Sequence, residues 1–365
     1  MQISRRDLLN LMGATGMAGA LSLSRPAIGQ GAGAEAALDA LAAEDRFSGS
    51  VLLARNGRPV LRKAWGMADR EKQVPSRPDT RFNFASMGKM FTAVGIAQLV
   101  EAGKLGWNDR LSDHLPDFPK ETASRVTIAQ LLSHQAGFGA YFASPRWREV
   151  QSSVRSVSDF VALFRDEPLQ FEPGSRFGYS NNGYVLLGAV IERLTGEDYY
   201  AAMAKRIFRP AGMTKTGWFM PGTLPADAAR SYTNGCAMRR DCTPQPWRAF
   251  PLDHGSPAGG GYSTADDWLA FANALHGGKL IKPATLAEML KPRSDLPPGG
   301  PSATYGWGFG LIDLAGKPAF GHNGGAPGVG AELQTTVDGA VTLIMLTNQD
   351  GAVRPALAAI RQTLA

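Results

Sequence analysis

The residues best suited to do chemistry lie in Ser86-Met87-Gly88-Lys89, a Ser-x-x-Lys motif. A serine hydroxyl is a weak nucleophile until a base removes its proton. A lysine three residues on along a helix shares the serine's face, and it can be that base if burial or nearby positive charge keeps it neutral. The alternative is an N-cap serine followed by a solvent-facing lysine. An apolar helical stretch runs on to about Ala102, so the pair is expected at a helix start, where N–H groups favour negative charge.

A second motif, Tyr179-Ser180-Asn181, lies in a turn-rich segment just before residues 183–195, which have helical spacing. Its side chains can therefore project from a loop. A phenol near two cationic groups ionises more easily and can relay protons. A packing tyrosine and an N-cap asparagine, at Asn181 or Asn182, would explain the same residues without chemistry.

The third motif is His322-Asn323-Gly324-Gly325, after a short predicted strand. The order Ser-x-x-Lys, Tyr-x-Asn and then a basic or imidazole residue-x-Gly resembles the serine penicillin-recognising hydrolases. That family includes class C β-lactamases, D-alanyl-D-alanine carboxypeptidases and related esterases. The resemblance covers about residues 47–348 and implies a cleft between a sheet lobe and a helical lobe as the active site.

The resemblance implies a catalytic role for the first two motifs. Ser86 would be the nucleophile, and Lys89 with Tyr179 would take its proton and return one to the leaving group. Asn181 would hold the carbonyl or amide of the substrate.

The third motif is expected to bind substrate. Gly324 would let the substrate lie against the strand edge like an added strand, and N–H groups of Ser86 and Gly325 would form an oxyanion hole. Most family members have Lys-Thr-Gly where this chain has His322-Asn323-Gly324, although several carboxypeptidases and esterases have histidine. That difference weakens the expectation of β-lactam specificity more than that of hydrolysis.

We therefore expect a serine hydrolase that cleaves an ester or amide through an acyl-enzyme, first as an esterase or generalist, then as a D-alanyl-D-alanine carboxypeptidase, then as a β-lactamase. A non-catalytic peptidoglycan or acyl-peptide binding protein on the same fold, and an acyl transferase, are the alternatives. Ser263, in Gly-Tyr-Ser-Thr-Ala, approximates the nucleophile elbow of α/β-hydrolases, but no buried strand is predicted before it. Two further matches to the family, residues 131–137 and 258–264, are assigned to packing and cleft shape.

The first 30 or so residues resemble an export signal, with Arg5-Arg6 near the start and an apolar stretch from Leu11 to Ser24. An amphipathic first helix of the domain is the alternative. We expect export to the periplasm by the twin-arginine machinery, with membrane contact only through an uncleaved signal. The expected organisation is a signal at 1–30 and one hydrolase domain at 31–365, with a sheet lobe at 37–85 and 256–365 and a helical lobe at 86–255.

Composition narrows the partners. The formal net charge is +6, but the basic residues are scattered among acidic ones, so nucleic-acid binding is not expected. Cys236 and Cys242 are the only cysteines; they are disulfide candidates in an oxidising compartment, or two free thiols. No metal-binding spacing, phosphate loop or dinucleotide fingerprint is present, so we predict no metal or cofactor and a small-molecule ester, amide or peptide substrate.

Strand patterns occupy both ends of the chain. Asn56-Gly57 predicts a hairpin near the start, and strands are expected at 306–313, 320–322, 331–337 and 340–347, with a turn at Asp338-Gly339. The expected helices lie at 128–132, 157–164, 183–195, 199–207, 265–275 and 355–364. Thr264 with Asp267 predicts a capping box. This is an α/β fold: an antiparallel sheet from both chain ends, flanked by helices, with an inserted, mostly α-helical lobe.

Overall fold

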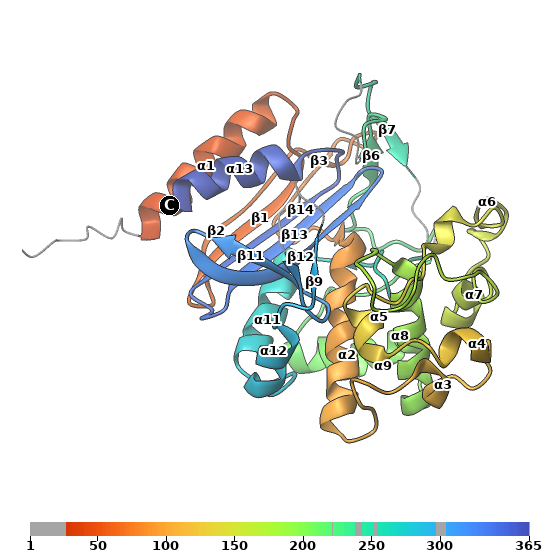
Figure 1. The fold of residues 1–365 in the computed structure, drawn as a ribbon. Coiled ribbons are helices and arrows are strands. Elements are labelled where there is room, and N and C mark those ends of the chain that lie inside the picture. The colour runs from red at the N-terminus through yellow and green to blue at the C-terminus, as the bar shows by residue number, and fades with distance from the viewer. Residues whose placement is uncertain (1–26, 221, 238–242, 251–253, 297–303, 365) are drawn as a thin grey trace, which may run out of the picture.

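The computed structural model describes residues 27–220, 222–237, 243–250, 254–296 and 304–364 (Figure 1). Within them, eight antiparallel strands form one sheet in the order β2-β1-β14-β13-β12-β11-β10-β9. The strands are β1 Gly49–Arg55, β2 Arg58–Trp65, β9 Ser294–Asp295, β10 Thr304–Tyr305, β11 Gly310–Leu314, β12 Lys317–Ala326, β13 Val329–Thr336 and β14 Val341–Thr347. Because β1 pairs with β14 from Gly49↔Thr347 to Arg55↔Val341, strands from the two ends of the chain lie side by side in the sheet. The predicted sheet is confirmed.

Helices cover both faces of this sheet (Figure 1). On one face, α1 (Ala27–Ala43) packs against α13 (Val353–Leu364) and β2. On the other lie α2 (Lys89–Glu101) and α11 (Ala265–His276). Ala34 and Leu38 of α1 are fully buried, so the packed domain includes this helix, which begins before the expected boundary at residue 30. Residues 1–26, which hold the predicted export motif, lie outside the described residues.

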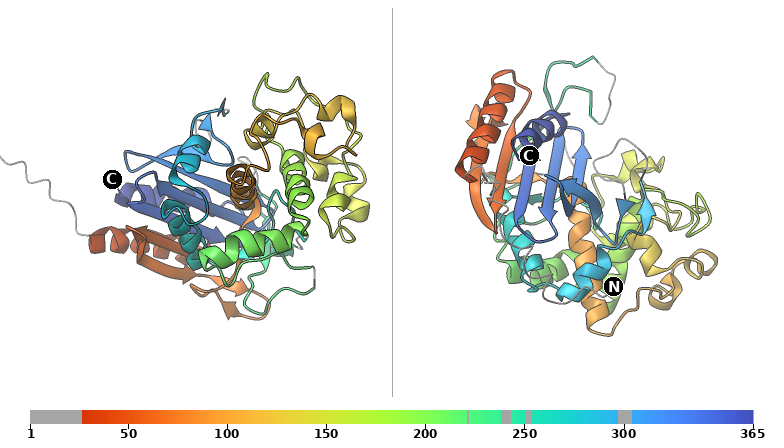
Figure 2. Two further views of the ribbon diagram at one scale, coloured as in Figure 1. Left: turned by 90° about the horizontal axis from the view of Figure 1, so that it is seen from below. Right: turned by 60° about the vertical axis from the view of Figure 1, so that its left-hand side comes forward.

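The helical lobe lies beside the sheet (Figure 2). It comprises α3 Leu111–His114, α4 Lys120–Ala123, α5 Ile128–Leu132, α6 Trp147–Val150, α7 Val157–Val161, α8 Asn181–Thr195, α9 Tyr199–Met203, the π-helical turn Ala204–Phe208 and α10 Arg209–Ala211. The central helix α8 ends at Gly196, whose φ is +70°. Ser180 caps its N-terminus by accepting the Gly183 N–H at 2.9 Å, so neither asparagine of the motif is the cap.

Three short strand pairs lie outside the large sheet in the described residues. They are β3 Met67–Asp69 with β4 Val74–Pro75, β5 Phe82–Asn83 with β8 Tyr262–Ser263, and β6 Ser231–Thr233 with β7 Arg248–Phe250. One further helix, α12 (Pro283–Met289), was not predicted. The β5–β8 pair matters most, because it places the segment before Ser86 against the glycine-rich segment before α11.

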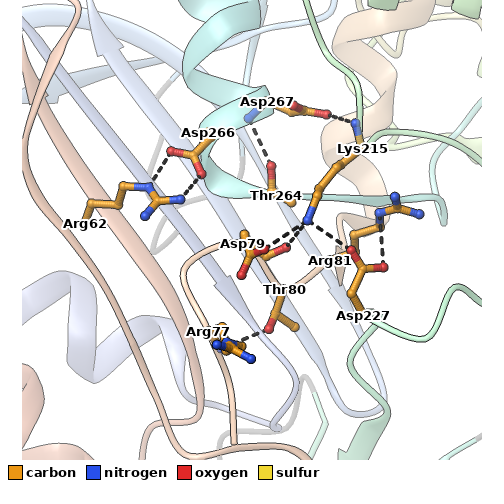
Figure 3. Close-up of polar contacts among 10 residues, drawn as sticks. All are labelled: Arg62, Arg77, Asp79, Thr80, Arg81, Lys215, Asp227, Thr264, Asp266 and Asp267. Atoms are coloured by element: carbon orange, nitrogen blue, oxygen red, sulfur yellow. Dashed lines mark hydrogen bonds and ion pairs between the residues drawn. The ribbon is translucent and has the colours of Figure 1, made fainter.

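An ion network anchors that junction (Figure 3). Lys215 Nζ lies 3.0 Å from Asp79 and 3.1 Å from Asp227, while Asp267 Oδ2 accepts the Lys215 backbone N–H at 2.7 Å. Thr264 accepts the Asp267 N–H at 3.1 Å and caps α11 as predicted. The reciprocal half of the predicted capping box is wrong, because the Asp267 carboxylate is turned to residues 214–216 instead. Exposed ion pairs contribute about 0–1 kcal/mol each, so this network orients the chain more than it stabilises it.

None of the helices in the described ranges has the length and apolar character needed to cross a membrane.

Candidate active site

The serine of the first motif lies in a strained turn. Ser86 belongs to the 3-10 turn Ala85–Gly88, which leads into α2. Ala85 has a φ of +42°, a region that residues with a Cβ rarely adopt. Two contacts hold it there: its N–H donates to Asn83 Oδ1 at 2.8 Å, and its carbonyl accepts the Gly260 N–H at 3.1 Å. A Cβ at Gly259 would lie 1.9 Å from the Ala85 carbonyl oxygen, so this approach requires glycine.

Lys89 is fully buried beneath Ser86. Its Nζ lies 3.1 Å from Ser86 Oγ, 2.7 Å from Asn181 Oδ1 and 2.8 Å from the Ala258 carbonyl oxygen. Burial holds the pKa of the Lys89 amine well below its ordinary value, because removal from water penalises the charged form. Burial therefore favours the neutral form of this amine, which lies in hydrogen-bond contact with the candidate nucleophile.

Tyr179 approaches Ser86 from the helical lobe. Its hydroxyl lies beside Ser86, and its ring centroid lies 4.8 Å from Lys89 Nζ. Although 43% of the residue is exposed, protein surrounds the hydroxyl end, and this burial raises the pKa of the phenol well above its ordinary value. The expectation that this phenol ionises easily was wrong, since the two neighbours expected to be cationic are neutral. Tyr179 is a proton-bearing phenol.

The third motif lies inside a strand rather than after one. Strand β12 continues to Ala326 because it pairs with β13 along its whole second half. Its pairing with β11 stops at Gly321; beyond that point no described strand pairs with this edge, to which an extended substrate can add. A Cβ on Gly324 would lie 2.6 Å from the Phe84 carbonyl oxygen and 2.9 Å from the Ser86 nitrogen. Strand and nucleophile turn are thus in direct contact, and Gly325 follows on the same strand.

His322 is buried at 6% exposure. Its Nδ1 lies 2.5 Å from the Asn323 carbonyl oxygen and its Nε2 lies 2.9 Å from the Tyr305 hydroxyl. A carbonyl can only accept, so Nδ1 carries the proton and Nε2 accepts from Tyr305. Burial lowers the pKa of His322 to about 3. The imidazole is therefore neutral at ordinary pH.

The structure adds a contact with Lys89 to two of the sequence assignments. Asn181, expected to hold substrate, uses its side-chain oxygen to hold Lys89. The Ala258 segment, expected only to shape the cleft, supplies the other carbonyl acceptor; its glycine-rich sequence and its match to the family were the signal. The rival nucleophile Ser263 is fully buried, with its hydroxyl 2.7 Å from that of Thr216.

The remaining predictions concern cysteines and metals. Cys236 is disulfide-bonded, while its candidate partner Cys242 lies outside the described residues. Among the described side chains, no group of three or more His, Cys, Asp or Glu could hold a metal ion.

A family model described as Beta-lactamase matches residues 34–365. The chain belongs to this family. Penicillin-binding protein 4* of Bacillus subtilis (strain 168) is 31% identical over 86% of this chain and 70% of that protein. Esterase EstB of Burkholderia gladioli is 29% identical over 90% of this chain and 94% of that protein. The crystal structure of the D-amino acid amidase from Ochrobactrum anthropi SV3 with L-phenylalanine amide superposes with a TM-score of 0.77 at 26% identity, covering 92% of this chain and 99% of that one.

These similarities confirm the family and fold expected from the three motifs. The protein is a hydrolase of the serine β-lactamase family.

Proposed function

We propose that the protein hydrolyses uncharged esters or amides of small acyl groups through a covalent acyl-enzyme on Ser86. The observation that carries this proposal is the set of contacts around Lys89. A neutral amine has two N–H donors and one lone pair, and two of its three contacts are carbonyl oxygens that can only accept. The two N–H groups are thereby assigned to Asn181 and Ala258, which leaves the lone pair facing the Ser86 hydroxyl.

The same contacts suit the charged form that catalysis would produce. As Ser86 Oγ bonds to the carbonyl carbon, its proton passes to Lys89 Nζ. The resulting ammonium has three donors for the same oxygens of Asn181, Ala258 and Ser86. Lys89 would therefore change its protonation state without changing its partners, which avoids reorganisation during the reaction.

The rest of the cycle follows from the turn and the strand edge. The developing oxyanion would be held by the backbone N–H groups of Ser86 and Gly325. The bond from the acyl carbon to the leaving oxygen or nitrogen then breaks, and that atom takes a proton from Lys89, directly or through the phenol of Tyr179, so that Lys89 is neutral again. Water then attacks the ester on Ser86 while Lys89 takes its proton. As the bond from the acyl carbon to Ser86 Oγ breaks, Lys89 returns that proton to Ser86 Oγ and the acid is released.

Charge favours esters and amides without a carboxylate. D-alanyl peptides and β-lactams carry a carboxylate, and binding it calls for a cation. Lys89 and His322 are both held neutral by burial, so neither supplies positive charge in the resting enzyme. Similarity to Esterase EstB supports the same ranking. A D-alanyl-D-alanine carboxypeptidase is the second candidate, because the similarity to Penicillin-binding protein 4* favours it.

We also propose that the enzyme acts in the periplasm after twin-arginine export, an assignment supported by Arg5-Arg6 and the apolar stretch after them. Replacing both arginines by lysine should retain the protein in the cytoplasmic fraction. If the variant is found in the same cellular fraction as the wild type, the proposed export is contradicted.

The activity is tested with the wild type and Ser86→Ala on p-nitrophenyl acetate, nitrocefin and a peptide ending in D-alanyl-D-alanine, with intact-mass spectrometry of the quenched reaction. The proposal expects ester turnover above nitrocefin turnover and an acyl adduct on Ser86 that is lost in Ser86→Ala. Release of D-alanine as the fastest reaction would favour the peptidase. Equal ester turnover by the wild type and Ser86→Ala would exclude Ser86 catalysis and favour a binding protein.

A further inference from the structure

His134 is a buried histidine beside the active site that the proposed mechanism does not use. It is 1% exposed, and aromatic rings surround it. The ring centroids of Phe177, Tyr184 and Tyr305 lie 5.7, 5.1 and 4.9 Å from its own, and that of Tyr179 lies closest, at 4.3 Å.

His134 accepts hydrogen bonds from the backbone on both sides of Tyr179. Its backbone carbonyl accepts the N–H of Gly178, the residue before Tyr179, at 2.8 Å. Its Nδ1 accepts the N–H of Ser180, the residue after Tyr179, at 3.1 Å. With the ring contact, three independent interactions fix the position of Tyr179, whose hydroxyl lies beside Ser86.

The rest of the structure fixes His134 itself. It follows α5, and it adopts a left-handed φ of +59°. The next residue closes the turn by donating its N–H to the Gln130 carbonyl at 2.8 Å. Gln130 belongs to the capping box that Thr127 forms at the start of α5. The contacts between His134 and the Tyr179 segment thus start from the end of α5, a helix whose first and last turns are both fixed by hydrogen bonds.

The hydrogen bond from Ser180 also defines the tautomer. Nδ1 accepts the Ser180 N–H, so the ring proton lies on Nε2, and among the described residues that buried atom has no hydrogen-bond partner. Burying a donor without a partner is destabilising, a penalty that a leucine or phenylalanine of similar size would avoid. Packing alone therefore does not explain an imidazole here, whereas the need for an acceptor at Nδ1 does.

We infer that His134 is a positioning residue that holds the Tyr179 hydroxyl against Ser86. It is not a proton carrier: a proton on Nδ1 would face the Ser180 N–H and break that contact. Burial also holds the pKa of His134 well below its ordinary value. The inference rests on the proposed function of Ser86 and adds a residue through which the geometry of the site is set.

Two substitutions separate the acceptor from the ring. His134→Leu removes the Nδ1 acceptor and places at a positive φ a residue that adopts this conformation less readily than histidine. His134→Asn loses the ring but keeps a side-chain oxygen close to the position of Nδ1, and asparagine tolerates positive φ. His276→Asn is the matched control, because it makes the same change in a histidine away from the site. The His276 imidazole, at the end of α11, bonds Thr335 at 2.9 Å and lies against Phe320.

The deciding experiment is a double-mutant cycle with Tyr179→Phe, measuring kcat and KM for p-nitrophenyl acetate. Misplacing a catalytic group by about 1 Å can cost ~100-fold, so we expect kcat to fall by about 10- to 100-fold in His134→Leu with little change in KM. We expect His134→Asn to restore most of it and His276→Asn to match the wild type. In the Tyr179→Phe background, neither change at His134 should cause a further loss, because the hydroxyl that His134 positions is absent.

Equal fold-losses in the two backgrounds would overturn the inference, since His134 would then act independently of Tyr179. Should His134→Leu fail to fold, His134→Ala, which also lacks the Nδ1 acceptor, takes its place in the same comparison. Failure of the proposed function has a different signature: Ser86→Ala would keep the wild-type activity. If Ser86→Ala is inactive and the kcat losses of the His134 and Tyr179 variants multiply in the double variant, only the role of His134 is wrong.

Discussion

Glu332 offers a sharp test of the electrostatics of the sheet. It lies on β13 directly opposite Asn323 of the third motif, and it is 4% exposed. Its Oε1 accepts from Gln334 Nε2 at 2.8 Å, and Gln334 in turn accepts from Arg361 of α13 at 3.0 Å. Burial raises the pKa of Glu332 from 4.5 to about 7, an effect that the Gln334 bond and Arg361 only partly offset.

The consequence for stability has a definite sign. The folded protein holds the Glu332 proton more tightly than the unfolded chain, so its contribution is complete below pH 4.5 and is lost as pH rises through about 7. A shift of that size corresponds to about 3 kcal/mol at 1.36 kcal/mol per pKa unit. Between pH 5 and pH 8 the wild type should therefore lose about 2–3 kcal/mol through this group alone.

The perturbation is Glu332→Gln, which keeps an acceptor for Gln334 and removes the charge. Thermal melts at one scan rate from pH 5 to pH 8 should show the wild type losing about 5 °C relative to the variant, at roughly 2 °C per kcal/mol for a chain of this size. Glu149→Gln is the matched control, because that carboxylate is exposed. Parallel curves for the wild type and Glu332→Gln would refute the reasoning.

Three further predictions concern the site. Asn181→Asp should raise the pKa of Lys89, because a carboxylate would replace the oxygen 2.7 Å from Nζ; kcat/KM for an ester at pH 7 should fall at least tenfold and recover toward high pH, and an unshifted pH profile would contradict this. Gly259→Ala should lower kcat by about 100-fold, since its Cβ would lie 1.9 Å from the Ala85 carbonyl oxygen; wild-type rates in steady-state assays would show that the turn needs no glycine. His322→Lys should raise nitrocefin turnover relative to ester turnover by supplying a cation for the carboxylate, and an unchanged ratio would argue against the charge-based ranking.

Much of the fold could be predicted from the sequence because its signals were local. Asn56-Gly57 gave the first hairpin, with φ values of +49° and +74°, and Gly196 gave the end of α8. The extent of β12 could not be predicted, since glycine-rich residues extend as a strand only because β13 lies beside them.

The site shows the same division. The types and spacing of Ser86 and Lys89 predicted a nucleophile beside an amine. They could not show that the acceptors for that amine are Asn181 and a backbone carbonyl at Ala258, 169 residues further along the chain. Nor could they show that burial keeps the proton on Tyr179. Both depend on tertiary packing, which no local pattern reports.

The central claim is that Lys89 is a neutral amine with its lone pair on Ser86. The most direct measurement is the pH dependence of Ser86 acylation, taken from the burst phase with p-nitrophenyl acetate between pH 5 and pH 10. The account predicts a rate that is already level at pH 7 to 8, because the amine is deprotonated well below the usual lysine pKa of 10.5. A rate that climbs tenfold per pH unit through pH 9 would mean that Lys89 is charged in the resting enzyme, and would contradict the account.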